Sequence, residues 1–420
     1  MAGMSCASAL APHFRRVVLL ERDGLEGGRA PRRGVPQGRH VHFLLVSGLR
    51  ALEALLPGLG RELEAAGAVQ TQVGRSMRFI THGAPVAAFE GPLSTYLISR
   101  PMLEWLVRRR VKAIANVELY SSAKVAAPIA ERGVVRGVVL ANGERLDADL
   151  VVDASGRSSR ALHWLRELGK PTPAEERYEI CLTYTSQNLR LAQQPSWDIL
   201  YAAPTPGGNR SGVIMRVEQG QYVATLAGYQ GDHARPDDEA FLAYAARIHP
   251  ELAQVLRHAV EVGPFHVHRL KRMNWRMFHR LREHPEGLLV VGDALGQLDP
   301  VYGQGMSVAA MEAGVLGALL GQHGHVRGLP GRFYRAVAPI IGRAWNVSVA
   351  EELRRPVSGR RPLGLPLIHR YLDQVLHLAH RHPSVSRAFA ESTHMTTGRL
   401  GLFRPGVLGR VLLREAGVLR

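Results

Sequence analysis

The sequence contains little cysteine and no apolar run long enough to span a membrane. Cys6 and Cys181 are its only two cysteines and lie far apart, which excludes a disulfide scaffold and favours a reducing, cytoplasmic location. No stretch reaches the roughly 20 apolar residues that cross a bilayer, and the first residues do not resemble a secretory signal. Neither cysteines nor histidines follow a zinc-binding spacing. We therefore expect no structural metal and no membrane-spanning segment.

Acidic residues are outnumbered, with 36 Asp and Glu against 53 Lys and Arg and a formal net charge of +17. Such a surplus can mark a nucleic-acid partner or an anionic membrane. The arginines are dispersed, and no basic segment is interleaved with aromatic residues, so we expect no nucleic-acid binding. The clusters Arg354-Arg355 and Arg360-Arg361 leave a weak contact with a membrane surface open.

The sequence does contain a loop rich in glycine and proline between an apolar strand and an apolar helix. Residues 288–291 predict a buried strand that ends in Gly292-Asp293, and residues 306–320 predict a helix. Gly303 and Gly305 allow backbone to approach a bulky ligand, and the start of the helix offers N–H groups to negative charge. A carboxylate at the strand end can accept hydrogen bonds from ribose or ribityl hydroxyls. This combination predicts a nucleotide-cofactor site.

This loop and two further segments resemble the motifs of FAD-dependent monooxygenases with the para-hydroxybenzoate hydroxylase fold. The loop corresponds to the Gly-Asp motif, whose aspartate, here Asp293, holds the ribityl chain. Asp153-Ala154-Ser155-Gly156 is similar to the second motif, and Arg100 to the arginine that meets the cofactor at a helix start. The alternatives are that Asp293 only caps a helix and that Arg100 is a solvated surface residue. The resemblance implies FAD contacts from Gly292, Asp293, Pro300, Gly303, Gln304, Gly305 and Met306 of the loop, and from Arg100 and Asp153.

The same resemblance implies an α/β fold over nearly the whole chain. A Rossmann-like FAD-binding domain is expected to be discontinuous, with a mainly antiparallel substrate-binding sheet inserted into it and a helical region at the C-terminus. The order of patterns, which alternates early, becomes strand-rich and then turns helical, agrees with this arrangement. Residues 41–56 predict a helix, residues 75–89 predict two short strands, and residues 134–140 and 145–152 predict a hairpin. The expected boundaries are 1–74, 95–170 and 280–328 for the FAD-binding domain, 75–94 and 171–279 for the sheet domain, and 329–420 for the helical region.

The first part of the chain resembles a dinucleotide-binding unit that lacks its first strand. Residues 17–20 predict a buried strand followed by Glu21 and Arg22, and an acidic residue at this position binds the adenosine ribose in such units. Gly3 would be the third glycine of the G-x-G-x-x-G turn, whose first two glycines are absent. We expect either a start codon assigned too late or a natural truncation, with weak FAD binding as the consequence. Restoring upstream codons is then expected to raise FAD retention.

The resemblance implies that NADH or NADPH reduces FAD and that O2 forms a flavin hydroperoxide, which hydroxylates or epoxidises a substrate. The segment Gln37-Gly38-Arg39-His40-Val41-His42 resembles a loop of a bacterial subgroup that includes polyether-forming polyene epoxidases, where it lies near the flavin and substrate. Arg39 could stabilise negative charge on the reduced flavin, and Arg39 and His40 are the predicted catalytic residues. Two imidazoles without a carboxylate make a poor metal site, so no metal is expected.

The substrate must be recognised by the inserted sheet, whose predicted strands mix apolar and hydroxyl side chains. This mixture suits an apolar polyketide, terpenoid or quinone-like molecule of secondary metabolism. The Trp-x-Trp-x-Ile-Pro motif of flavin halogenases is absent. A reductase or desaturase of a prenyl lipid and a degenerate, non-catalytic member of the fold remain as alternatives, and the oligomeric state and the choice between NADH and NADPH stay open. The candidate cavity residues in the sheet are Tyr184, Thr185, Ile214, Met215, Thr225 and Tyr229.

Overall fold

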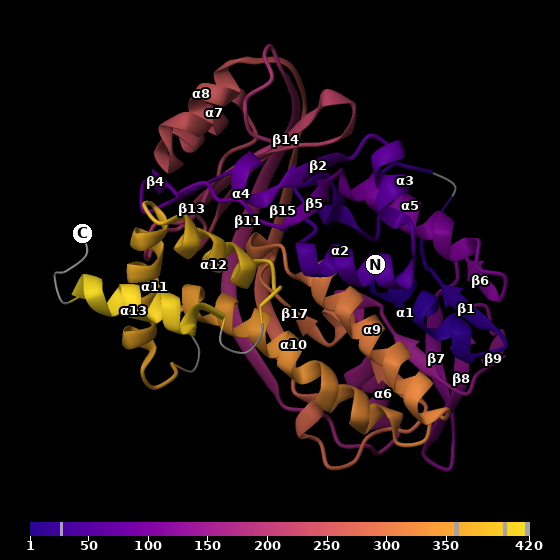
Figure 1. Cartoon of the computed structure of the whole chain (residues 1–420). Helices are drawn as coiled ribbons and strands as arrows, with labels where there is room; N and C mark the ends of the chain where they lie inside the picture. Colours follow the sequence, from indigo (N-terminus) through magenta and orange to yellow (C-terminus); the bar gives the residue numbers. More distant parts are fainter. Residues whose placement is uncertain (26–27, 357–360, 398–400, 416–420) are drawn as a thin grey trace.

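The computed structural model describes residues 1–25, 28–356, 361–397 and 401–415. It combines a region of short parallel strands and long helices, a large sheet that crosses the molecule, and a cluster of C-terminal helices at one edge (Figure 1). Helices and strands both run through the described chain, so the predicted α/β class is confirmed. None of the described helices is long and apolar enough to cross a bilayer.

The parallel strands are short apolar runs, which is typical of strands buried on both faces. β1 (Val17–Leu20) pairs with β6 (Val117–Tyr120), and β10 (Val151–Asp153) pairs with β16 (Leu288–Val290). In the part of the chain that the structure describes, these strands form two separate pairs. The helix α1 (Ala2–Leu10) contacts both β1 and β10 and therefore connects the two pairs.

Small side chains let α1 pack closely on α9 (Gly305–His323). A Cβ atom on Gly317 would lie 3.4 Å from the carbonyl oxygen of Ala9, and a Cβ atom on Gly292 would lie 2.7 Å from the Cβ of Ala2. Because α9 continues from the loop after β16, the packing of α1 fixes the position of that loop. The apolar run after residue 305 is a helix, as predicted.

The large sheet has eight strands, in the order β17-β15-β11-β14-β13-β12-β3-β4. Neighbouring strands are antiparallel except for β12 and β3, which run parallel. The strand pattern before residue 90 is confirmed, and it joins a sheet whose other strands come much later in the chain. The strands span Met77–Thr81 (β3), Ala84–Pro85 (β4), Glu175–Leu191 (β11), Ile199–Ala202 (β12), Arg210–Arg216 (β13), Tyr222–Gly228 (β14), Ala259–Arg276 (β15) and Gly296–Gln297 (β17). A separate antiparallel pair consists of Val69–Gln72 (β2) and Ser94–Leu97 (β5).

Helices cover the remaining surfaces, and the region after residue 329 is helical, as predicted. The long helix α10 lies beside α9, and α11, α12 and α13 gather at the edge of the molecule (Figure 1). The helices span Val46–Leu55 (α2), Leu59–Ala65 (α3), Val73–Ser76 (α4), Arg100–Lys112 (α5), Ala161–Glu167 (α6), Asp238–Ile248 (α7), Pro250–Arg257 (α8), Leu329–Glu352 (α10), Leu365–Ala379 (α11), Pro383–Thr393 (α12) and Pro405–Glu415 (α13).

Two predictions of individual elements need correction. The helix predicted over residues 41–56 begins only at Val46, because the residues before it are not helical. The predicted hairpin of β8 (Val134–Leu140) and β9 (Arg145–Asp147) is present, but a third strand, β7 (Val125–Glu131), pairs with the other edge of β8. Alanines weaken the strand pattern of β7, since alanine has a low preference for strands.

Of the two arginine pairs that left a membrane contact open, Arg354 and Arg355 are not available to lipid. The side chains of Arg354 and Arg355, just after α10, are only 9% and 3% exposed and form ion pairs with acidic residues. Arg360 lies outside the described residues. Arg361 donates hydrogen bonds to the carbonyl oxygens of Leu353 and Arg355. The expected role of Arg354 and Arg355 at a membrane surface is therefore wrong.

Candidate functional site

A cavity of about 1550 Å³ lies between the parallel strands, the large sheet and the C-terminal helices. At one end its walls come from α1, β1 and the loop between β16 and α9. At the other end they come from β3, β12 and β13 of the sheet and from α10, α11 and α12. The predicted site residues that line it are Gly3, Glu21, Arg22, His40, Arg100, Asp153, Gly292, Asp293, Pro300, Gly303, Gln304, Gly305 and Met306.

The loop after β16 presents a free carboxylate to this cavity. Asp293 is half-buried, and no protein group in the described chain donates a hydrogen bond to its side chain. A Cβ atom on Gly305 would lie 3.8 Å from Oδ1 of Asp293, so the helix start and the carboxylate are neighbours. Gly303 has a φ of +66°, a conformation that glycine adopts without strain. The carboxylate is therefore placed to accept hydrogen bonds from a ligand.

The start of α9 adds polar groups without partners. The helix begins at Gly305 with no side-chain cap from Gln304, so its first N–H groups are free to meet negative charge. The Gln304 side chain is only 2% exposed, and its Oε1 atom has no hydrogen-bond partner among the described residues. Buried polar atoms without partners are unfavourable, so this end of the cavity suits a polar ligand.

Arg100 is the buried cation of the site. It begins α5, is 9% exposed, and lies 3.6 Å from the carboxylate of Glu104 through its Nε atom. This contact is too long for a hydrogen bond, and Nε has no other partner among the described residues. Burial lowers the pKa of the guanidinium, which stays protonated because the ordinary pKa of arginine exceeds 12. A buried cation that is incompletely paired favours an anionic ligand.

The acidic residue at the end of β1 is already paired. Oε2 of Glu21 lies 2.7 Å from Nη1 of Arg32, and the same guanidinium donates to Glu104. Arg22 donates a hydrogen bond to Oγ of Ser158 at 2.9 Å. No local pattern marks Arg32, because its acidic partners come from two other segments, residues 21–23 and Glu104 of α5.

Gly3 allows α1 to approach the parallel strands. A Cβ atom at this position would lie 3.3 Å from Cδ1 of Leu19 and 3.4 Å from Cβ of Ala154. Contacts this short leave little space for a larger side chain. Gly3 therefore supports the wall of the cavity through close packing.

Asp153 holds a turn beside the cavity in addition to lining it. Its carboxylate accepts hydrogen bonds from the backbone N–H of Ser155 at 2.9 Å and from Oγ of Ser159 at 2.6 Å. These bonds hold the turn that contains Gly156, where a Cβ atom would lie 3.8 Å from the Cβ of Asp293. The geometry thus favours a role in positioning the loop, while Asp153 also lines the cavity and its direct contact with the cofactor stays a prediction.

The two predicted catalytic residues, His40 and Arg39, differ in their surroundings, because His40 is buried at the cavity and Arg39 is exposed outside it. His40 is 5% exposed, and its Nδ1 atom lies 2.7 Å from Oγ of Ser186, which is 2.6 Å from Oγ1 of Thr225. Burial, aided by the neighbouring imidazole of His268, lowers the pKa of His40 to about 3, so the ring is neutral near pH 7. Arg39 is exposed and does not line the cavity. The predicted role of Arg39 at the flavin therefore needs correction.

The sheet contributes only part of the predicted wall. Tyr184, Met215 and Thr225 line the cavity. Thr185 donates to the carbonyl oxygen of Ala234 instead, Ile214 lies in an apolar core, and Tyr229 binds an acidic residue. The strand pattern alone does not tell which face of a sheet is hollowed.

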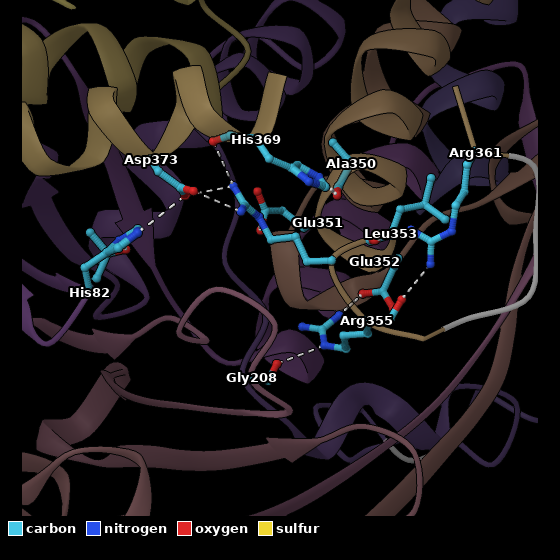
Figure 2. Close-up of polar contacts among 12 residues, drawn as sticks. His82, Gly208, Ala350, Glu351, Glu352, Leu353, Arg355, Arg361, His369 and Asp373 are labelled. Atoms are coloured by element: carbon cyan, nitrogen blue, oxygen red, sulfur yellow. Dashed lines mark hydrogen bonds and ion pairs between the residues drawn. The ribbon is translucent and has the colours of Figure 1, made fainter. Parts of the chain in front are cut away.

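The C-terminal helices supply polar residues that the sequence did not indicate. Nη2 of Arg354 donates to Oδ1 of Asp373 at 2.9 Å, and Nε donates to Oε2 of Glu351 at 3.0 Å. His82 approaches the Asp373 carboxylate from the side opposite to Arg354 (Figure 2), and its Nε2 atom lies 3.4 Å from Oδ1 of Asp373. All four residues line the cavity. They come from the loop after β3, from the end of α10 and from α11, and no local pattern reveals that these segments meet.

A buried charged network lies behind the loop before α9. The hydroxyl of Tyr229 donates to Oδ2 of Asp299 at 2.9 Å, and Nη1 of Arg355 donates to Oε1 of Glu352 at 2.6 Å. The guanidinium of Arg355 lies 3.8 Å from the centre of the Tyr229 ring, a cation–π contact. Burial raises the pKa of the carboxyl groups of Asp299 and Glu352, and the charge of Asp299 raises the pKa of Glu352 further. The network joins the end of α10 to the loop that presents Pro300 and Gly303 to the cavity.

The model of a family described as FAD binding domain matches residues 2–328, most of the chain. The chain belongs to this family. The resemblance to FAD-dependent monooxygenases is thereby confirmed, with FAD as the cofactor and NAD(P)H as the reductant of the family, and the protein is an FAD-dependent oxidoreductase.

Individual relatives agree with this fold. Protein Rv3254 of Mycobacterium tuberculosis (strain ATCC 25618 / H37Rv) is 29% identical over 372 residues, which cover 84% of this chain and 78% of the relative. The flavin-dependent brominase Bmp2 superposes with a TM-score of 0.71 at 14% identity, over 99% of this chain and 96% of its own. PqsL, a probable FAD-dependent monooxygenase of Pseudomonas aeruginosa, superposes with a TM-score of 0.61 at 17% identity, over 84% of this chain and 94% of its own.

Proposed function

We propose that the protein is a monooxygenase that hydroxylates or epoxidises an apolar small molecule of the polyketide, terpenoid or quinone-like class with O2 and NAD(P)H. The observation that carries the proposal is that one cavity runs from the Asp293 loop into a chamber with largely apolar walls. A substrate in the chamber would lie next to a cofactor held by the loop. The chamber is lined by Phe79, Tyr201, Met215, Leu376 and Phe389.

The polar end of the cavity fits FAD. We propose that Asp293 accepts hydrogen bonds from the ribityl chain and that the start of α9 and Arg100 face its negatively charged parts. Glu21 would bind the adenosine ribose after exchanging its contact with Arg32. When bound, FAD supplies the chemistry that takes electrons from NAD(P)H and activates O2. The full proposed set is Gly3, Glu21, Arg22, Arg100, Gly292, Asp293, Pro300, Gly303, Gln304, Gly305 and Met306, in the discontinuous FAD-binding domain 1–74, 95–170 and 280–328.

The protein's own residues would bind, orient and exclude water. The neutral imidazole of His40, fixed by Ser186, can offer a hydrogen bond inside the cavity without introducing a charge. Arg100 provides positive charge in a site of low solvent access, where its attraction for negative charge is strongest. The apolar walls of the chamber would hold the substrate by burial of its surface.

The proposal is tested by oxygen uptake. We expect the purified protein, supplied with FAD and NAD(P)H, to consume O2 in step with product formation when an apolar substrate is added. Asp293→Ala is expected to lose most of its bound flavin and its turnover, whereas Glu261→Ala, at an exposed acidic position on β15, keeps both. Conversion of a prenyl lipid without oxygen uptake would instead favour a reductase or desaturase. Protein that stays colourless after FAD titration would favour a non-catalytic member of the fold.

A further inference from the structure

Exposed apolar side chains are concentrated on the C-terminal helices. Of the eleven large apolar residues that are exposed in the described chain, seven lie between residues 363 and 413. Leu367 is 71% exposed and Leu412 is 57% exposed. A surface of this kind is unusual for a helix that faces only water. We define the apolar patch as Leu363, Leu367, Phe403, Leu408, Leu412 and Leu413.

Specific contacts bring the two parts of this patch together. The ring of Phe403 stacks on Tyr371 of α11, with 4.8 Å between the centroids. Nε of Arg370 lies 2.9 Å from Oε1 of Glu415, at the other end of α13. α13 therefore packs against the middle and second half of α11, and Tyr371 lies one helical turn from Leu367. Figure 1 shows α13 at the outer edge of the molecule.

The apolar side of the helix α13 is wider than the surface that it buries, because two adjacent faces of the helix are apolar. Val407 and Val411, four residues apart, are buried against the rest of the protein. Leu408 and Leu412, also four residues apart, are exposed. One apolar face is explained by the fold, and the second has no partner within the described chain.

Arginines outnumber acidic residues in the C-terminal region that carries the patch. The described residues after 360 contain seven arginines and only three acidic residues. Each acidic residue, Asp373, Glu391 or Glu415, already forms an ion pair with an arginine. Arg370, whose side chain is 66% exposed, lies beside the patch, and Arg410 and Arg414 are on α13 itself. An apolar surface with an arginine rim is complementary to an anionic bilayer, whose headgroups attract the cations while the leucines enter the interface.

We propose that the apolar patch docks the protein on an anionic membrane surface, with α13 lying in the plane of the interface. The same helices form a wall of the chamber, because Leu372 and Leu376 of α11 and Leu402 line the cavity. Docking would thus place the chamber next to the lipid, and an apolar substrate could pass between them. That last step rests on the proposed function, whereas the docking does not.

The test uses the full chain and vesicles, without substrate. We expect the protein to sediment with vesicles of equal parts phosphatidylglycerol and phosphatidylcholine and to bind pure phosphatidylcholine vesicles at least roughly tenfold more weakly. High salt should release it from the mixed vesicles, since the attraction is electrostatic in part. Leu412→Asp and Leu367→Asp should each weaken binding by roughly tenfold or more, because a buried leucine is replaced by a charge that the headgroups repel.

The matched control is Val260→Asp. Val260 lies on β15, away from the C-terminal helices, and is 63% exposed, similar to Leu412. This variant should bind the vesicles like the unchanged protein, and so should Asp293→Ala, which separates docking from flavin binding. Absence of vesicle binding by the unchanged protein, or equal binding by all variants, overturns the proposal. A fall in solution mass from dimer to monomer in Leu412→Asp, without vesicle binding by the parent, would assign the patch to a second copy of the chain.

Discussion

At the scale of single residues, Arg100 shows how burial gives a common side chain a preference for an anionic ligand. It is buried in a cavity wall with an unpartnered Nε, and the nearest carboxylate, that of Glu104, does not form a hydrogen bond with this atom. We expect Arg100→Gln to weaken FAD binding roughly tenfold or more, since a charged hydrogen bond to an anionic ligand is lost. Flavin titration followed by fluorescence quenching measures the change.

The control for this variant is on the same helix. Arg109 is half exposed and binds Glu62 outside the cavity. Arg109→Gln should leave FAD affinity unchanged, and equal losses in both variants would show that Arg100 acts only on the stability of α5.

Buried histidines make the stability of the protein depend on pH. Burial lowers the pKa of His40 to about 3 and those of His42 and His394 to about 4, against about 6.5 in an unfolded chain. Below pH 6.5 the unfolded chain therefore binds protons that the folded protein does not. We expect each of these histidines to lower the free energy of unfolding by about 1.4 kcal/mol per pH unit as the pH falls from 6.5 towards the pKa of that histidine in the folded protein.

Urea unfolding at several pH values between 7.5 and 5 tests this expectation. Stability should be constant from pH 7.5 to about 6.5 and then decline. His40→Gln should have a lower free energy of unfolding at pH 7.5, because the hydrogen bond to Ser186 changes. Its free energy of unfolding should fall less steeply with decreasing pH, since unfolding of the variant takes up one proton fewer. An unchanged slope would mean that His40 titrates normally in the folded protein.

At the scale of elements, close packing of α2 on α9 holds the start of α9 in place. A Cβ atom on Gly48 would lie 2.3 Å from Oγ and 2.8 Å from Cα of Ser307, and the second of these is a backbone atom that cannot rotate away. We expect Gly48→Ala to push α2 from α9, to lower the free energy of unfolding by about 2 kcal/mol, and to reduce flavin retention. Thermal or urea unfolding together with flavin content measures both effects.

A glycine of α9 that contacts no other element provides the contrast. Gly314 is exposed in the interior of α9, and an added Cβ atom would meet nothing within 4 Å. Gly314→Ala should therefore stabilise the protein by up to about 1 kcal/mol and leave flavin binding unchanged. If Gly48→Ala also left the free energy of unfolding and the flavin content unchanged, the close contact between α2 and α9 would not hold the start of α9 in place.

Most elements could be predicted from local patterns, whereas their partners could not. The apolar runs of β1 and β16 and the helical pattern of α9 are properties of consecutive residues, and they appear as expected. β7 was missed because its alanines do not mark a strand. The sequence predicted the polar end of the cavity, since Asp293 and Gly305 belong to one short loop. Arg32, Arg354 and the other residues that meet across the fold carry no local signal.

At the scale of the whole molecule, one buried ion pair connects the C-terminal helices to the cofactor loop. Arg355 neutralises Glu352 close to Asp299, and all three side chains are at most 3% exposed. Arg355→Met should lower the free energy of unfolding by about 3 kcal/mol or more, because it leaves buried carboxyl groups without a cation. Arg355→Met combined with Glu352→Met should recover part of that loss, since the remaining apolar pair needs no neutralisation.

Chemical denaturation of the single and double variants measures this coupling. Arg190→Leu, which removes an exposed ion pair with Glu261, is the control and should change stability little. A double variant as unstable as the single one would indicate that Arg355 acts through its contact with Tyr229 rather than through charge.

The division of the cavity walls between early and late parts of the chain has a consequence for biosynthesis. Every proposed flavin contact precedes residue 307, whereas α11 and α12, which enclose the chamber, are made later. A ribosome releases the segments in that order, so the nascent polypeptide can capture its cofactor before the compartment for the organic reactant has closed. The yellow prosthetic group would then serve as a scaffold on which the final helices assemble.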